Sequence, residues 1–174
     1  MGDMIVGLDV GTTKTCAVIG HENENGQVEV VGVGVAPSKG LKNGVIVNID
    51  NTASAITKAV EDAELMAGHE VAGVLVGISG QHVKGENSRG VVAISNRSRT
   101  ISPVEVKRVI EAAQAVVIPV DREILHVLSK EFSVDDQTGI KDPIGMSGVR
   151  LEAEVHIITG ATTSIQNMIK SVDK

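Results

Sequence analysis

The first third of the chain alternates between β-branched apolar runs and short polar turns. Apolar runs at residues 5–10, 15–19 and 28–36 predict three consecutive antiparallel strands. From residue 49 to residue 67, apolar positions recur at spacings of four and three, as on one face of a helix. Asp50 and Asn51 are candidate N-caps, and Gly68 is a candidate helix stop. The apolar run at 71–79 predicts a fully buried strand, so the expected order is β-β-β-α-β.

The pattern is interrupted at Gly80-Gln81-His82, where we place a domain boundary. Residues 83–94 predict either a strand pair or one strand with a bulge at Gly90. Ser102-Pro103-Val104-Glu105 has the form of a capping box and opens a helix. Strands are expected at 123–134 and 150–160, and the second alternates strictly between apolar and polar residues. This segment therefore predicts a second unit of β-α-β-β order.

Three further features lie within residues 135–174. Residues 135–148 form a predicted long loop with three glycines, which is either a packed hairpin excursion or a contact surface. Arg150, at the start of the next strand, has Glu152 and Glu154 as candidate partners. A final helix begins near Thr163 and stops in mid-pattern at Lys174, which favours a chain that is part of a longer protein.

Composition narrows the classes of function. Hydrophobic residues make up 42% of the 174 residues, which suits a packed core, and the net charge is −6. Nucleic-acid binding is not predicted, because the longest basic cluster is Arg97-Ser98-Arg99 and the only aromatic residue is Phe132. The single cysteine, Cys16, favours a reducing compartment. The five histidines show no metal-ligand spacing, so no metal site of their own is expected.

The candidate site is the turn between the first two predicted strands, from Asp9 to Lys14. Gly11 is expected to adopt a backbone conformation that other residues resist, and Thr12 and Thr13 offer hydroxyl groups. Lys14 adds a cation, and successive backbone N–H groups of such a turn can bind an anion. Asp9 could hold a hydrated Mg²⁺. The alternative is an ordinary hairpin with a glycine turn.

The D-x-G-[ST]-x-K pattern of this turn resembles the first phosphate loop of the actin, Hsp70 and sugar-kinase superfamily, and it is not a P-loop. Other stretches resemble the bacterial cell-division family FtsA, and together they cover nearly the whole chain. The most specific of them is the segment from Gly139 to Leu151. The others are Gly40 to Gly44, Asn48-Ile49-Asp50, Ala63 to Gly68, Ile78 to His82 and Val155 to Gly160.

The resemblance implies a partial actin-like (ribonuclease H-like) lobe of mixed α/β class. Residues 1–82 and 161–174 would form an incomplete subdomain 1A, and residues 83–160 would form the inserted, family-specific subdomain 1C. In such a lobe Gly11, Thr12, Thr13 and Lys14 would contact the phosphates of ATP. Asp9 would assist Mg²⁺ through water, only with the nucleotide present. No residue is given a catalytic role, and nothing in this chain is expected to hold the base or ribose.

The resemblance also implies a place in the cell. Members of the family bind ATP between two lobes, polymerise on the inner membrane face, tether the FtsZ ring and recruit later division proteins. Their subdomain 1C serves self-association, and a C-terminal amphipathic helix, absent from this chain, anchors them to the membrane from the cytoplasmic side. The fragment itself is expected to be mainly an interaction module, with no ATP or Mg²⁺ bound and with slow or absent ATP turnover in the parent protein.

Two other interpretations stay open. A sugar-kinase-type phosphotransferase would use the same phosphate hairpin, but it needs a general-base aspartate that this chain does not visibly supply. A PilM-like pilus-assembly protein is also actin-like. The Gly145 to Leu151 segment favours FtsA over PilM.

Overall fold

The computed structural model describes residues 4–116 and 118–174. The chain divides into two compact units. Unit 1 consists of Met1–Val83 with Thr162–Lys174, and unit 2 consists of Lys84–Ala161. Each unit has its own hydrophobic core and its own four-stranded sheet.

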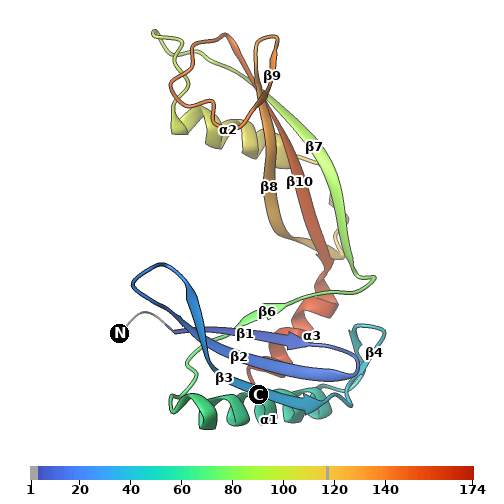
Figure 1. The fold of residues 1–174 in the computed structure, drawn as a ribbon. Coiled ribbons are helices and arrows are strands. Elements are labelled where there is room, and N and C mark those ends of the chain that lie inside the picture. Colours follow the sequence, from blue (N-terminus) through green and yellow to red (C-terminus); the bar gives the residue numbers. More distant parts are fainter. Residues whose placement is uncertain (1–3, 117) are drawn as a thin grey trace. The chain divides into compact units, whose positions relative to one another are not determined.

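Unit 1 is built on a four-stranded sheet of order β3-β2-β1-β6. The strands β1 (Met4–Val10), β2 (Lys14–Glu22) and β3 (Val28–Pro37) pair antiparallel, which confirms the predicted meander. The helix α1 (Ile49–Ala67) runs along one face of this sheet (Figure 1). The helix α3 (Thr162–Val172) packs beside α1. Residues 41–46, expected to be an extended link in part, form a small hairpin of β4 (Leu41–Lys42) and β5 (Val45–Ile46).

Close packing of α1 on β3 depends on small residues from both elements. Ala59 and Ala63 of α1 are completely buried against the sheet. Gly32 and Gly34 of β3 lie so close to the helix that a Cβ atom on either would overlap backbone atoms of α1. The helix ends as predicted at Gly68, which is left-handed (φ 69°) and donates its N–H to the Glu64 carbonyl oxygen.

Two details of unit 1 differ from the sequence prediction. The N-cap of α1 is Asn48, whose side chain accepts the Asn51 N–H, and not Asp50 or Asn51. The predicted buried strand at 71–79 was wrong in extent and in burial. Only β6 (Leu75–Gly77) is a strand, and Leu75 is 71% exposed. The reason is that β6 pairs along one edge with β1, and within the described residues only one of its faces meets the core.

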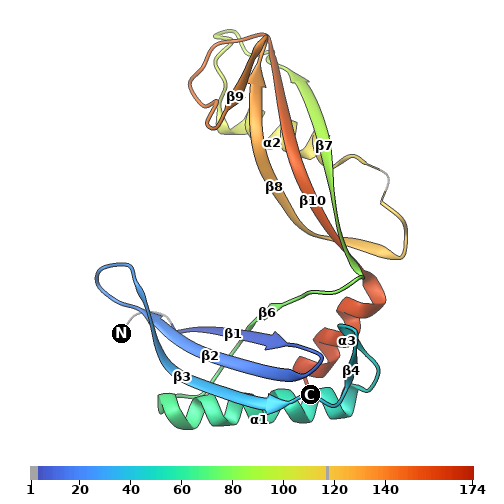
Figure 2. The ribbon, with the colours of Figure 1, turned by 45° about the vertical axis from the view of Figure 1, so that its right-hand side comes forward.

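Unit 2 is a four-stranded sheet of order β7-β10-β8-β9 with one helix, α2 (Pro103–Gln114). Figure 2 shows β10 (Arg150–Ala161) between β7 (Val83–Ala93) and β8 (Arg122–Val134). The region 83–93 is thus a single strand. The predicted alternation of β10 is confirmed, because its inward residues are completely buried: Leu151, Ala153, Val155 and Ile157.

The segment between β8 and β10 contains a strand that the sequence analysis placed in a loop. Residues Gln137–Ile140 form β9, which pairs with β8, so the unit has one strand more than the expected β-α-β-β. The following loop is packed against the body of the unit. The Ile101 N–H donates to the Met146 carbonyl oxygen at 2.8 Å, and the Ile94 N–H donates to the Val149 carbonyl oxygen at 2.8 Å. The packed excursion is therefore the observed conformation.

The Asp135 carboxylate holds the end of this loop. Its Oδ1 accepts the N–H groups of Val149 at 3.0 Å and Arg150 at 2.9 Å. Arg150 itself pairs with Glu152 on its own strand, with 3.1 Å between Nε and Oε1. Of the two partners expected for Arg150, Glu152 is thus the one that it contacts.

The predicted capping box of α2 is present. The Ser102 N–H donates to Glu105 Oε2 at 2.9 Å, and the Val104 N–H donates to Ser102 Oγ at 3.2 Å. Glu105 also accepts a hydrogen bond from the side chain of Asn96. These hydrogen bonds, those from Ser102 first, hold the pKa of the Glu105 carboxyl below its usual value. The ionised carboxylate is thus part of the helix start.

We expect unit 2 to become less stable in acid because of this cap. The pKa of Glu105 is lower in the folded chain than in the unfolded chain, so its contribution is complete above the unfolded pKa. It is lost as the pH falls through the folded pKa. Denaturant unfolding followed from roughly pH 6 to pH 3 should show this loss, since an unperturbed Glu titrates near pH 4.3.

The matched variants for this experiment are Glu105→Gln and Ser102→Ala. Glu105→Gln removes the ionisation and should flatten the pH dependence of unit 2 unfolding. Ser102→Ala removes the hydroxyl donor to the same carboxylate and should flatten it in part. An undiminished acid dependence in Glu105→Gln would assign the effect to other carboxylates.

Candidate functional site

The candidate site residues lie together at one end of the unit 1 sheet. Asp9 is exposed near the end of β1, opposite Cys16 of β2 and beside Gly77 of the parallel strand β6. The exposed residues Thr12 and Thr13 form the bend, and Lys14 begins β2. The structure thus places all five predicted residues, including Gly11, at the β1–β2 turn and the adjoining strand ends.

Gly11 is required for a reason other than the one the sequence suggested. It is not among the residues with positive φ, so the turn does not need a left-handed glycine at this position. Its N–H donates to the Lys14 carbonyl oxygen at 3.0 Å, and a Cβ atom on it would lie 3.0 Å from the same oxygen. The Gly11 N–H therefore closes the turn, and the absence of a side chain permits the close approach.

A neighbouring segment, residues 38–44, holds the turn from outside. The Ser38 N–H donates to the Thr13 carbonyl oxygen at 3.0 Å, and the hydroxyls of Ser38 and Thr15 are hydrogen-bonded at 2.8 Å. The Gly44 N–H donates to Thr12 Oγ1 at 3.0 Å. This support was not predicted from the sequence, although the Asn43-Gly44 dipeptide is a strong hairpin signal.

The chemistry available at the turn is that of anion binding. Lys14 supplies a cation, and Thr12 and Thr13 supply hydroxyl groups that can donate to phosphate oxygens. Asp9 is the carboxylate at hand for a hydrated Mg²⁺ brought by the anion. Within residues 4–116 and 118–174, no group of three or more His, Cys, Asp or Glu side chains is arranged to hold a metal ion.

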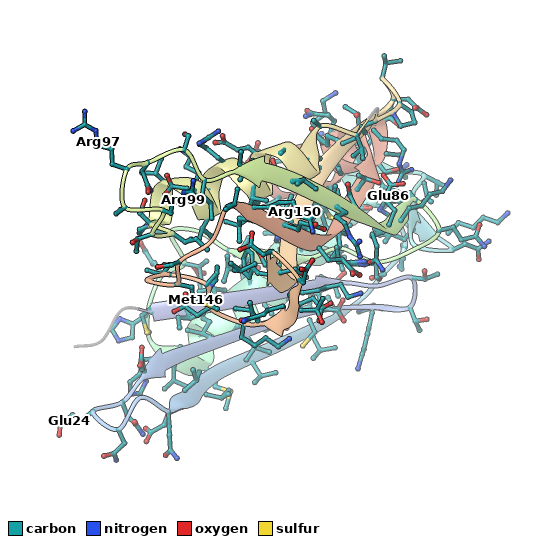
Figure 3. The ribbon with its side chains drawn as sticks, turned by 90° about the horizontal axis from the view of Figure 1, so that it is seen from above. Glu24, Glu86, Arg97, Arg99, Met146 and Arg150 are labelled. Atoms are coloured by element: carbon teal, nitrogen blue, oxygen red, sulfur yellow. The ribbon has the colours of Figure 1, made fainter. Side chains whose placement is uncertain are left out.

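The short basic cluster noted in the sequence belongs to unit 2. Arg97 extends from the turn before α2 into solvent (Figure 3). Arg99 is left-handed at φ 51°, and its carbonyl oxygen accepts the Gly148 N–H. The backbone of this turn therefore serves to hold the loop that precedes β10.

Among the described residues, no helix combines sufficient length with sufficient apolarity to cross a bilayer.

Comparison with known proteins identifies relatives over nearly the whole chain. The family described as "SHS2 domain inserted in FTSA" matches residues 80–159. The chain is 49% identical over 171 residues to the cell division protein FtsA of Pseudomonas aeruginosa, covering 98% of this chain and 40% of that protein. It is 51% identical over 172 residues to FtsA of Borreliella burgdorferi, covering 99% of this chain and 42% of that protein. The chain thus spans about two fifths of the length of these relatives.

A solved structure supports the fold. The PilM-PilN type IV pilus biogenesis complex aligns with a TM-score of 0.62 over 97% of this chain and 44% of its own. The sequence identity is 12%, so this likeness concerns the fold alone, and it fits a partial actin-like lobe. The sequence relationship distinguishes the two actin-like candidates, and the chain belongs to the FtsA family of cell-division proteins.

Proposed function

We propose that this chain forms the nucleotide-contacting and partner-binding part of an FtsA-type protein. Such a protein polymerises on the cytoplasmic face of the membrane at the division site, tethers the FtsZ ring and recruits later division proteins. The observation that carries the proposal is the 49–51% identity to FtsA proteins over 98–99% of the chain. Membrane attachment and FtsZ binding would be functions of the longer protein.

Unit 1 would correspond to part of subdomain 1A and would contact the phosphates of ATP. Thr12, Thr13 and Lys14 would face the phosphates, Gly11 would shape the turn, and Asp9 would meet Mg²⁺ through water. The exposure of Thr12, Thr13, Lys14 and Asp9 at one end of the sheet supports this assignment. The resemblance of the chain to FtsA proteins is the basis for proposing slow or absent ATP turnover in the longer protein.

Unit 2 would correspond to subdomain 1C and would serve self-association and partner recruitment. The loop before β10 is packed at its backbone, yet it presents apolar side chains to solvent. Ile144 is 50% exposed and Val149 is 52% exposed, while Pro143 in the same loop is fully buried. A hydrogen-bonded backbone beneath exposed apolar side chains supports a role as a contact surface.

A chimera tests the division function in the context of a whole protein. Residues 1–174 would replace the matching two fifths of P. aeruginosa FtsA in cells depleted of their own protein. We expect division to be restored, with cells of near-normal length. The control is the matching part of PilM, which has the same fold at 12% identity and should leave cells filamentous. Filamentous cells with the graft present at normal abundance would contradict the proposal.

The isolated chain should bind ATP only weakly. The residues assigned to the nucleotide touch its phosphates alone, so we expect a dissociation constant in roughly the millimolar range, equivalent to about −4 kcal/mol. Titration calorimetry should show the same weak binding for Mg²⁺-tripolyphosphate, and Lys14→Gln should weaken both. Low-micromolar binding of ATP, with much weaker tripolyphosphate binding, would show that this chain also binds the nucleoside part of ATP.

A further inference from the structure

We propose that the Asn43-Gly44 turn of the β4–β5 hairpin is a positioning element for the phosphate turn, acting through the hydroxyl group of Thr12. This inference rests on the proposed role of residues 9–14 as a phosphate site. It assigns Thr12 a second task, which is to fix the turn against a neighbouring hairpin in the conformation that meets the ligand.

The contact between the two turns is a hydrogen bond of 3.0 Å from the Gly44 N–H to Thr12 Oγ1. In this bond the threonine oxygen is the acceptor, and its own O–H stays available as a donor. Because the Gly44 N–H occupies one side of Thr12 Oγ1, the hydroxyl hydrogen of Thr12 can point only away from Gly44. The Gly44 N–H thereby orients Thr12 to donate to a phosphate oxygen.

The hairpin presents this N–H through a demanding backbone conformation. Asn43 and Gly44 have φ of 52° and 77°, and they join strand residues Lys42 and Val45, which pair directly. Two consecutive residues with positive φ in a two-residue loop define the type I′ hairpin, for which Asn-Gly is the preferred sequence. The direction of the Gly44 N–H is therefore set by local sequence and does not depend on the ligand.

The same turn also lies against the segment that follows β6. A Cβ atom on Gly44 would lie 3.2 Å from the Ser79 carbonyl oxygen and 3.3 Å from the Cα of Gly80. Two residues before Ser79, Gly77 is the register partner of Asp9. The Asn43-Gly44 turn thus lies against the turn that follows Asp9 and against the segment that follows β6, the strand paired with Asp9.

Two matched variants of Thr12 test the contact and its effect on the 174-residue chain. Thr12→Val is nearly isosteric and removes the acceptor, whereas Thr12→Ser retains it. The amide hydrogen exchange of Gly44 reports the contact. The shifts of the Thr13 and Lys14 amides during titration with Mg²⁺-tripolyphosphate report phosphate binding. We expect about tenfold faster exchange at Gly44 and about tenfold weaker binding in Thr12→Val, the size of one lost hydrogen bond, and smaller changes of both in Thr12→Ser, which retains the acceptor.

A second pair changes the hairpin and leaves residues 9–14 intact. Gly44→Ala places a Cβ against Ser79 in a backbone conformation with positive φ and should weaken tripolyphosphate binding several-fold. Asn43→Gly keeps the positive φ that the turn requires and should bind as the parent does. A merely structural role for the hairpin would lower stability in Gly44→Ala without changing the dissociation constant of the folded chain.

The outcomes separate this inference from the proposed function. Unchanged Gly44 exchange in Thr12→Val, or unchanged binding despite faster exchange, overturns the positioning role. If the parent chain shows no shifts at Thr13 and Lys14 with tripolyphosphate up to high millimolar concentrations, the phosphate site itself is overturned. In that case the Gly44 exchange data alone would establish a structural contact.

Discussion

Replacing Gly34 with alanine should lower the free energy of unfolding of unit 1 by about 3 kcal/mol, the upper part of the range for overpacked cores. The added Cβ would overlap the backbone of α1 at Ala59, and a helix backbone cannot rotate away as a side chain can. The helix would have to move off β3, which exposes the completely buried Ala59 and Ala63. Denaturant unfolding combined with amide hydrogen exchange would measure the loss and assign it to unit 1.

The matched control is Gly7→Ala in the same sheet. A Cβ on Gly7 of β1 would have no heavy atom within 4 Å beyond its chain neighbours, so we expect a change within about 0.5 kcal/mol, as for ordinary surface substitutions. Similar stability of Gly34→Ala and Gly7→Ala would mean that α1 is not seated on β3 as described.

Truncating Leu151 to alanine should destabilise unit 2 by about 3 kcal/mol, since buried leucines cost 2–5 kcal/mol when cut to alanine. Leu151 is completely buried on the face of β10 that packs against the core of unit 2. Because each unit has its own core, hydrogen exchange should accelerate in residues 84–161 and stay unchanged in β1, β2 and β3.

Leu128→Ala provides the control for the other face of the same sheet. Leu128 lies on β8 opposite His156 and is 52% exposed, so its truncation should cost well under 1 kcal/mol. A large effect at Leu128 would reveal that this face is covered in solution. Acceleration of exchange throughout unit 1 in Leu151→Ala would show that the two cores unfold together.

The elements with strong local signals were predicted from sequence. The meander of β1, β2 and β3 follows from alternating β-branched runs, and the start of α2 from its capping box. The inward face of β10 was correct at every position from Leu151 to Ile157. In each case the local pattern agrees with the tertiary environment, so no long-range information was needed.

The errors arose where tertiary contacts decide the conformation. An apolar run such as 71–79 is compatible with a fully buried strand, but burial on both faces requires neighbours that a local pattern cannot show. The strand β9 is four residues long and contains Gly139 with positive φ, so it carried only turn signals. The nearer of the two predicted N-caps of α1, Asp50, lies two residues after the observed one. The reason is that Asn48, Asp50 and Asn51 are all suitable capping residues.

The candidate site was likewise predicted only in part. A recognisable motif of six consecutive residues sufficed to bring Asp9 and Lys14 into one turn. The support from Ser38 and Gly44 crosses separations of 25 and 32 residues, counted from Thr13 and Thr12, and no periodicity marks such contacts. The chemistry of the turn was thus accessible from sequence, whereas the scaffolding that orients Thr12 was not.

Unit 2 begins and ends at neighbouring points of its own sheet. The Thr159 hydroxyl, close to the end of β10, lies 3.5 Å from the carbonyl oxygen of Lys84, close to the start of β7. A module whose two ends lie close together can be gained, lost or exchanged during evolution without distorting the domain into which it is inserted. The same geometry makes the segment suitable for grafting, because a few flexible residues could span the site of excision and a related module could be inserted in its place.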